Sequence, residues 1–330
     1  MPAAHTPTVE PAGTDRPADV LADAELAALV QDSRDEPGPT WRETGAVEVR
    51  RGQRERAAAR PRGPELYEVR DLTVGQVPAR LYRPDETREP SATIVFLHGG
   101  GFATGGLESH DRACRRLARG AGACVLAVDY RLGPEHPWPA GVDDAVAAAR
   151  WAAAGLPGPL VLMGDSAGGC IATLACLRLR EQGGPLPAAQ VLLYPNTDLT
   201  LAQPSMREFG EGWTLDAADV AWGAAAWVPD PERRADPGVS PLFAPDLGGL
   251  PAAVIVTCAY DPLRDEGEAY ASGLAAAGTH VRHRRELGMI HGFLTLDTVS
   301  PAAAAAGERV FADLLAVLGE DGAGGEGTQA

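Results

Sequence analysis

The segment MGDSAGG at residues 163–169 decides the fold. It follows an apolar run, Leu160 to Met163, and it opens an alanine-rich stretch of helical character at 168–181. Glycines on both sides of a serine, in the pattern G-x-S-x-G, permit a sharp strand-to-helix turn that lifts the serine hydroxyl above the edge of a sheet. The positive end of the following helix would point at that hydroxyl. Ser166 is therefore the candidate nucleophile.

Apolar runs alternate with alanine-rich helical stretches on both sides of this segment. Continuous apolar runs suit strands that are covered on both faces, and their alternation with helices is typical of a mostly parallel sheet. Upstream, 65–83 alternates apolar and polar residues about Gly75 and predicts a hairpin. Strands are expected at 93–97, 124–130, 160–163, 191–194, 253–260 and 281–287, and helices at 18–31, 111–120, 141–154, 168–181, 265–277 and 301–318.

Two segments interrupt this alternation. Residues 33–64 are rich in Pro, Gly and Arg and have little period, whereas 199–250 hold three tryptophans, several prolines and one amphipathic helix. The second segment is too long for a simple connection, so we expect an insertion over the carboxyl edge of the sheet. The predicted organisation is an N-terminal arm and part of a cap at 1–64, with mobile residues at 1–18, a core at 65–198 and 251–320, the cap insertion at 199–250 and a flexible tail at 321–330.

The composition excludes several classes of function. The 330 residues contain 29 arginines, no lysine and 45 acidic residues, which give a formal charge of −16. Such a charge opposes binding to nucleic acids and to anionic membranes. Without lysine, Schiff-base enzymes, P-loops and S-x-x-K hydrolases are excluded. The five cysteines form no C-x-x-C pair and the N-terminus lacks an apolar signal region, so we expect a cytoplasmic protein.

A second glycine run, HGGG at 98–101, follows the first buried strand. Residues without a β-carbon let successive backbone N–H groups converge on an anion. We expect the N–H groups of Gly99, Gly100 and Ala167 to form a three-donor oxyanion hole. The alternative is a glycine turn that serves only tight packing.

A serine at such a turn needs a base from later in the chain. Three histidines follow Ser166. His280 and His283 flank or lie within a polar strand, where their side chains would face solvent, whereas His291 lies in a loop between Gly288 and Gly292 just beyond that strand. Sites of open α/β sheets form at the carboxyl ends of the strands, which favours His291 as the base.

The acid is expected at the end of a strand between the serine and this histidine. Asp261 directly follows the apolar run AAVIVTCAY, and Asp198 ends another strand. Asp265 lies at the start of a helix, where capping alone explains it. Asp261 is the predicted acid, with an Asx turn before Pro262 as its structural alternative.

Other conspicuous residues have structural explanations. Glu135 and His136 lie between prolines and indicate a rigid, ion-paired loop. Cys170 and Cys176 occupy a helix with small neighbours and are predicted to be core thiols. The tryptophans of the insertion suit either a substrate pocket or the core of a cap: Trp213, Trp222 and Trp227.

The chain resembles the bacterial hormone-sensitive-lipase-like esterases of the α/β-hydrolase fold. The resemblance spans roughly residues 65–318 and rests on motifs in the family order: HGGGF at 98–102, YRLGPEHPWPA at 130–140, GDSAGG at 164–169, YPNTD at 194–198, DPLRDEG at 261–267 and HGF at 291–293. It implies a mostly parallel central sheet flanked by helices, under a helical cap built from the N-terminal segment and the insertion. It also implies a triad and its oxyanion donors: Ser166, His291 and Asp261, with Gly99, Gly100 and Ala167.

We therefore expect a serine hydrolase that cleaves carboxylic esters of short to medium acyl chains through an acyl-enzyme intermediate, with no cofactor or metal. An N-acetyl amide or another acylated metabolite would suit the same triad. A non-catalytic small-molecule receptor is a third hypothesis, which the presence of His291 disfavours. The sequence leaves open the natural substrate and the oligomeric state, for which a homodimer is one option.

Overall fold

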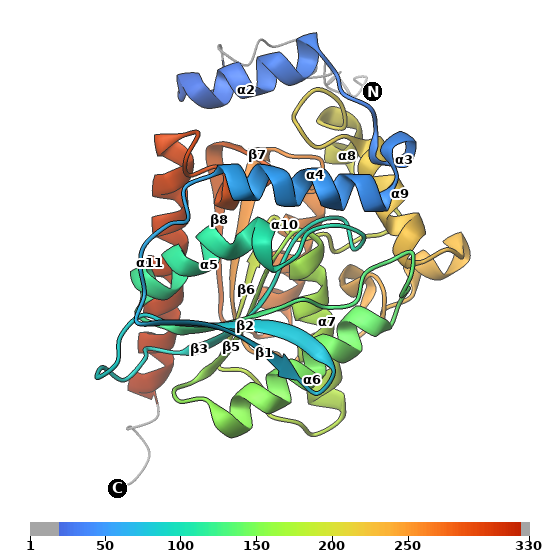
Figure 1. Ribbon diagram of the computed structural model, residues 1–330. Coiled ribbons are helices and arrows are strands. Elements are labelled where there is room, and N and C mark those ends of the chain that lie inside the picture. The colour runs from blue at the N-terminus through green and yellow to red at the C-terminus, as the bar shows by residue number, and fades with distance from the viewer. Residues whose placement is uncertain (1–19, 325–330) are drawn as a thin grey trace, which may run out of the picture.

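One eight-stranded sheet organises the computed structural model shown in Figure 1, which describes residues 20–324 and the side chains of residues 20–319. The strand order is β1-β2-β4-β3-β5-β6-β7-β8. β1 (Glu68–Val74) and β2 (Val77–Arg83) form the predicted hairpin, and β2 is antiparallel to β4. All other neighbouring strands are parallel, which confirms the predicted fold class.

Five of the six parallel strands lie close to their predicted positions because each is an apolar run, whereas the last strand is largely polar. Every residue of the four central strands is buried. The last strand continues past Leu287 to Ile290, so His291 follows a strand directly and not a glycine loop. The strands are β3 (Thr93–Leu97), β4 (Cys124–Val128), β5 (Leu160–Asp165), β6 (Ala189–Leu193), β7 (Ala252–Tyr260) and β8 (Val281–Ile290).

Next to β3, the side of the sheet on which the chain adds its next strand changes. From β3 the chain moves to β4 on one side, and it then crosses to β5 on the other side and continues to β6, β7 and β8. In open α/β sheets, the crevice outside the carboxyl ends of the strands at such a switch point is where ligands bind. Residues 98–101 follow β3 and Ser166 follows β5, so the topology brings the two glycine-rich motifs together at this crevice.

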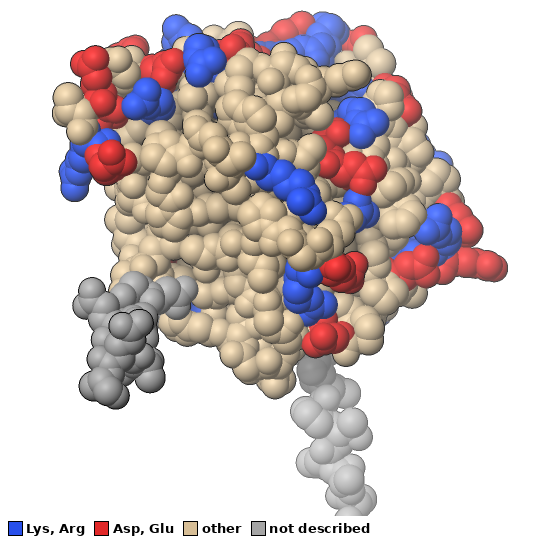
Figure 2. Space-filling view, turned by 90° about the horizontal axis from the view of Figure 1, so that it is seen from below, with Lys and Arg blue, Asp and Glu red and all other residues tan. Residues whose placement is uncertain are grey.

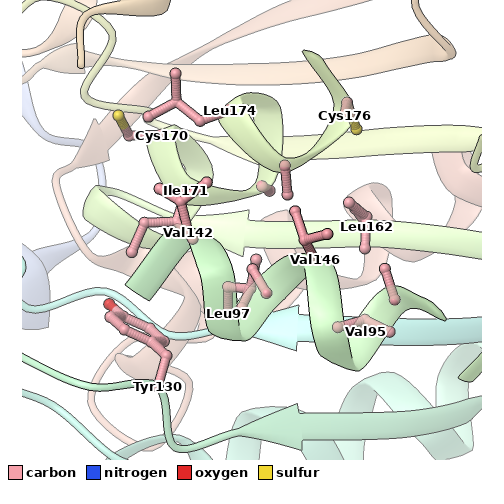
Figure 3. Close-up of a cluster of buried hydrophobic side chains, with 14 of the residues drawn as sticks. Val95, Leu97, Tyr130, Val142, Val146, Leu162, Cys170, Ile171, Leu174 and Cys176 are labelled. Atoms are coloured by element: carbon pink, nitrogen blue, oxygen red, sulfur yellow. The ribbon is translucent and has the colours of Figure 1, made fainter. Parts of the chain in front are cut away.

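Helices cover both faces of the sheet. α6 (Ala140–Gly155), α7 (Ala167–Glu181) and α10 (Arg264–Ala276) pack on one face, and α5 (Leu107–Ala121) and α11 (Pro301–Gly324) pack on the other. Figure 3 shows side chains of α6 and α7 packed against β3 and β5. All five cysteines are free and buried, as expected for core thiols.

Helices from two distant segments gather beyond the carboxyl edge, in the upper part of Figure 1. The N-terminal segment supplies α2 (Ala24–Asp35), α3 (Trp41–Thr44) and α4 (Ala46–Ala59). The insertion supplies two α-helices and two 3-10 turns, and a further 3-10 turn follows β8: α8 (Pro204–Glu208), α9 (Ala217–Trp227), η2 (Pro231–Ala235), η3 (Pro241–Phe243) and η4 (Phe293–Thr295).

The two cap segments hold each other by side-chain contacts. The backbone N–H of Trp41 donates to Asp219 at 2.8 Å, and the Trp41 ring meets the Trp222 ring edge-on, with 6.2 Å between their centroids. The guanidinium of Arg34 lies 4.5 Å over the ring of Trp213. Such contacts join residues about 180 positions apart in the chain, and neither segment alone would form this cap.

α4 is a helix that the sequence did not predict. Only Val49 is buried among its residues, so the segment has no apolar stripe to reveal its period. Polar contacts dock it instead: Arg50 donates to the carbonyl oxygens of Ala103 and Gly133, at 2.7 Å each. The same guanidinium pairs with Glu135 at 2.8 Å, which confirms the ion-paired loop.

The ends of the chain are only partly described. The predicted mobile residues 1–18 lie outside the described residues, and so do residues 325–330 of the predicted tail. Residues 321–324 of that tail belong to α11.

The surface is mixed in charge where Figure 2 shows it. Acidic and basic side chains lie beside one another on this face. Within residues 20–324, no helix combines the length and the apolar character needed to cross a membrane.

Candidate active site

Ser166 lies at a strained turn between β5 and α7. Its φ of 55° falls in the left-handed region, which residues other than glycine rarely adopt. A β-carbon on Gly164 would lie 2.2 Å from the carbonyl oxygen of Gly168, and one on Gly168 would lie 1.9 Å from that of Leu97. The backbone around the serine therefore accepts only glycine at both flanking positions.

Three predicted side chains meet at the carboxyl edge of the sheet. His291 Nε2 lies 2.9 Å from Ser166 Oγ, and His291 Nδ1 lies 2.9 Å from Asp261 Oδ2. The other carboxylate oxygen, Asp261 Oδ1, accepts the N–H of Leu263 at 2.8 Å. The Asx turn considered as an alternative is thus present as well, and one buried carboxylate both shapes the turn after β7 and contacts the imidazole.

The alternative histidines and aspartates lie elsewhere. His280 precedes β8 at its amino end, and His283 lies 3.1 Å from the hydroxyl of Thr257 in the first half of that strand. Asp198 accepts hydrogen bonds within its own turn, from residues 200 and 203. Asp265 accepts the N–H of residue 205 in α8. The structure places only Asp261 and His291 in line with the serine.

The backbone donors near Ser166 differ from those predicted. The N–H of Gly99 donates to Asp165 Oδ1 at 2.8 Å, so this expected oxyanion donor is already engaged. In the described part of the chain, the N–H groups of Gly100, Gly101 and Ala167 have no acceptor, and all three residues line the cavity next to the serine. Gly99 is therefore corrected to a structural donor, and Gly101 replaces it as a candidate.

Asp165, which directly precedes Ser166 in the G-x-S-x-G motif, positions the HGGG turn. It is buried between the N–H of Gly99 and the imidazole of His110 on α5, whose Nε2 lies 3.3 Å away. Burial alone would raise the pKa of this carboxyl, but His110 and the Gly99 N–H outweigh burial and lower the pKa. A buried carboxylate thus ties the oxyanion loop to both β5 and α5.

His98 supports the same turn from the other side. Its ring stacks on Tyr130 with 4.4 Å between centroids, and its Nδ1 lies 2.9 Å from the carbonyl oxygen of Gly99. Nε2 has no partner within residues 20–319. Burial, together with nearby His110, lowers the pKa of His98 to about 4, so the ring is neutral near neutral pH.

A further buried carboxyl, Glu266 on α10, shapes the loop after β6. Its Oε1 accepts the N–H of Thr197 at 2.6 Å and the side-chain amide of Asn196 at 2.8 Å. The backbone N–H of Asn196 in turn donates to the carbonyl oxygen of Ser166 at 3.2 Å. Burial raises the pKa of Glu266 well above its ordinary value. This carboxyl therefore holds the wall of the site behind the serine.

Ser166 and His291 open into a cavity of about 280 Å³. Residues of the cap insertion and Leu263, just before α10, form an apolar part of its lining. Residues of α4, with Arg60 directly after it, form a polar part. Trp41 of the N-terminal segment also lines the cavity, whereas Trp213 and Trp227 are fully buried in the cap. The apolar part is Leu215, Val220 and Leu263, and the polar part includes Gln53, Arg56 and Arg60.

Comparison with known proteins shows the family of this chain. A family model described as the alpha/beta hydrolase fold matches residues 94–295. The chain belongs to the alpha/beta hydrolase family. This hydrolase is 42% identical over 273 residues to the carboxylic ester hydrolase LipN of Mycobacterium tuberculosis, with 78% of this chain and 72% of that protein covered. It is 37% identical over 232 residues to the ethyl acetate hydrolase of Pseudomonas putida, with 68% and 73% covered.

Solved structures show the same architecture. The hyperthermophilic esterase of Pyrobaculum calidifontis is 36% identical to this hydrolase and has a TM-score of 0.77, with 82% of this chain and 93% of that chain covered. An alpha/beta hydrolase from the metagenome of Lake Arreo is 35% identical, with a TM-score of 0.84 and coverage of 91% and 99%. The predicted resemblance to the hormone-sensitive-lipase-like esterases is confirmed by these matches.

Sequence reasoning missed several polar residues that surround the site of this hydrolase. Asp165 carried a usable signal, because a charged residue that ends a fully buried strand needs a partner. His110 lies on the buried face of α5, where the same reasoning applies. Glu266 stands in the first turn of α10 and looks like an ordinary acidic residue near a helix start. Its role depends on a loop 70 residues earlier in the chain, which sequence spacing does not reveal.

Proposed function

We propose that this hydrolase cleaves carboxylic esters of short to medium acyl chains through an acyl-enzyme on Ser166. The observation that carries the proposal is the line from Ser166 Oγ through His291 to Asp261, with 2.9 Å at each step. Relatives named as carboxylic ester hydrolases support the class of reaction. A cavity of about 280 Å³ supports the short acyl chain, because pockets for drug-sized ligands measure roughly 300–1,000 Å³.

The first half of the reaction forms the acyl-enzyme. Ser166 Oγ attacks the carbonyl carbon while His291 Nε2 accepts the hydroxyl proton. The His291 Nδ1–H donates to Asp261, which fixes the tautomer that leaves Nε2 free to accept, and the carboxylate stabilises the imidazolium that forms. His291 then gives the proton to the departing alkoxide, and the alcohol leaves.

The tetrahedral intermediate places a negative charge on the former carbonyl oxygen. The N–H groups of Gly100 and Ala167, assisted by that of Gly101, are the donors proposed to hold it. One such donor contributes about 3 kcal/mol of transition-state stabilisation. In the second half of the reaction, water attacks the acyl carbon and His291 accepts its proton. The imidazolium then returns the proton to Ser166 Oγ as the bond to the acyl carbon breaks and the carboxylic acid leaves.

A substrate panel tests the proposal. We expect 4-nitrophenyl esters from acetyl to hexanoyl to be hydrolysed faster than octanoyl and decanoyl esters, because the cavity is small. Ser166→Ala should lower kcat about 10⁴-fold or more. In the wild type, a fluorophosphonate should label Ser166 and no other serine. Equal activity of the two proteins would remove Ser166 from the mechanism.

A second experiment distinguishes ester hydrolysis from amide hydrolysis. Acetanilide and phenyl acetate differ only in the bond to the acetyl group, and the amide needs stronger protonation of its leaving group. We expect the ester to be hydrolysed and the anilide to react far more slowly. Comparable rates would favour the deacylase hypothesis with the same triad.

A further inference from the structure

We propose that the polar wall of the cavity binds a carboxylate of the substrate, so that the preferred ester carries a negative charge on one of its two arms. Arg56 and Arg60 are the residues assigned to this carboxylate. The proposal rests on the proposed ester hydrolysis at Ser166 and adds the substrate class to it.

The spacing of the α4 residues directs this wall at the site. Gln53, Arg56 and Ala57 lie at intervals of three and four residues, which puts them on one face of the helix, and Arg60 directly follows the last helical residue. All four line the cavity that contains Ser166. The Gln53 amide fixes that face against the oxyanion loop, since it accepts the N–H of residue 105 at 2.8 Å and donates to the hydroxyl of residue 104 at 3.2 Å.

Ion pairs engage the first two arginines of α4 but not the two arginines at the cavity. Arg50 pairs with Glu135, and Arg51 pairs with Glu48 and Glu55 on the same helix. Within residues 20–319, neither Arg56 nor Arg60 forms an ion pair. Arg60 donates to the carbonyl oxygen of Thr295 at 3.1 Å, which leaves further guanidinium N–H groups available.

The cavity supplies no acid of its own to balance these charges. The one carboxylate among its lining residues is Asp165, which is already held by His110 and the Gly99 N–H. A bound carboxylate would balance the positive charges of Arg56 and Arg60, and guanidinium groups bind carboxylates through paired hydrogen bonds.

The rest of the lining defines the remainder of the ligand. Leu215, Val220 and Leu263 offer apolar contacts without a hydrogen-bonding side chain. A substrate that matches both parts has one short apolar arm and one carboxylate arm, with the ester between them. The half-ester of a dicarboxylic acid has this form, and so does an acyl ester of a hydroxy acid.

Two matched pairs of substrates distinguish a carboxylate on the acyl arm from a carboxylate on the alcohol arm. 4-Nitrophenyl hydrogen adipate and 4-nitrophenyl heptanoate test a charge on the acyl arm, and 4-acetoxybenzoate and 4-acetoxybenzamide test a charge on the alcohol arm. We expect the wild type to show a higher kcat/KM for the charged member of one pair. In the double variant Arg56→Gln/Arg60→Gln, the ratio of kcat/KM for the charged ester to kcat/KM for the neutral ester should fall about tenfold, mainly through KM. An effect of this size is expected for the loss of a charge-assisted hydrogen bond.

Arg54 offers a matched control on the same helix. It forms no ion pair in the described structure and does not line the catalytic cavity. Arg54→Gln removes one positive charge from α4, as Arg56→Gln alone does, so it should leave the ratio unchanged if the position of the charge matters. Equal effects of the control and the double variant would overturn the proposal, as would a charged-to-neutral ratio below one in the wild type for both pairs.

Inhibition of the wild type gives a test that needs no variant. Adipate should compete with 4-nitrophenyl butyrate more strongly than adipamide does, and added NaCl should weaken this competition. Equal inhibition by the two compounds would contradict the carboxylate site. Hydrolysis of the neutral butyrate ester, and its loss in Ser166→Ala, report on the proposed function separately, so the two proposals can fail independently.

Discussion

The turn that carries Ser166 and the cap that covers it are built in opposite ways. At the turn, backbone packs on backbone, because a β-carbon on Gly168 would lie 1.9 Å from a carbonyl oxygen of β3. In the cap, side chain packs on side chain, as the rings of Trp41 and Trp222 do. Backbone contacts of this kind accept no added atom, whereas side-chain contacts can be repacked. We infer that the turn fixes the chemistry and that the cap adapts the site to its substrate.

The largest effect is expected from one methyl group at the turn. Gly168→Ala would force apart β3 and the start of α7, and we expect a loss of more than about 4 kcal/mol in the free energy of unfolding, measured by urea denaturation. Gly288→Ala in β8 is the matched control, because a β-carbon there meets no atom within 4 Å. It should change stability by less than about 1 kcal/mol. Similar losses in both variants would refute the contrast between turn and periphery.

The next largest effect concerns the carboxylate that ties the turn to the oxyanion loop. Asp165→Asn keeps an oxygen that can accept the Gly99 N–H, but it removes the charge that faces His110. Breaking a buried pair costs about 3–5 kcal/mol, and a loosened oxyanion loop should lower kcat about 10–100-fold. KM should change little, because the carboxylate acts through the loop. A variant with normal kcat would show that glycine packing alone positions the donors.

The same contrast separates the parts of the fold that the sequence predicts from the parts that it does not predict. The parallel strands and the flanking helices were predicted because burial on both faces leaves long apolar runs, as in β5 and β7. Ser166 and Asp261 could be predicted because each directly follows such a strand, and His291 because it lies beyond the carboxyl end of the polar strand β8. α4 could not be predicted, since it is docked by polar contacts such as those of Arg50 and has no apolar period.

Details of the site were less predictable than its main residues. The assignment of Gly99 as an oxyanion donor was wrong because its N–H is taken by a side chain on another strand. The N–H direction within a glycine run depends on backbone angles such as the φ of 131° at Gly100, which a sequence of successive glycines does not encode. Long-range side-chain partners therefore decide which amides remain available.

The histidine beneath the oxyanion loop predicts a pH dependence of stability. Burial and His110 lower the pKa of His98 from 6.5 to about 4, so between these values the unfolded chain binds a proton that the folded chain does not. Stability should therefore fall as the pH drops from 6.5 to about 4, by about 3 kcal/mol, and change no further from this group below that range.

A non-titrating replacement isolates this contribution. Urea denaturation of the wild type and of His98→Asn at pH 7 and pH 4.5 should show a smaller loss in the variant, since its side chain takes up no proton on unfolding. The difference between the two losses is the quantity of interest, because other groups titrate in both proteins. Parallel losses would mean that His98 is solvated or charged in the folded chain.

The smallest effect is expected in the cap. Trp41 is half-buried between Trp222 and the oxyanion loop, where a β-carbon on Gly101 would lie 2.8 Å from its ring. Trp41→Ala should cost about 2 kcal/mol, less than loss of a fully buried tryptophan, because part of the ring already faces solvent. KM for hexanoyl esters should rise more than KM for acetyl esters, since a longer chain reaches farther into the cavity that the ring lines. A fall in kcat on acetyl esters of the size expected for Asp165→Asn would instead make the cap part of the catalytic machinery, and the division between a rigid turn and an adaptable cover would not hold.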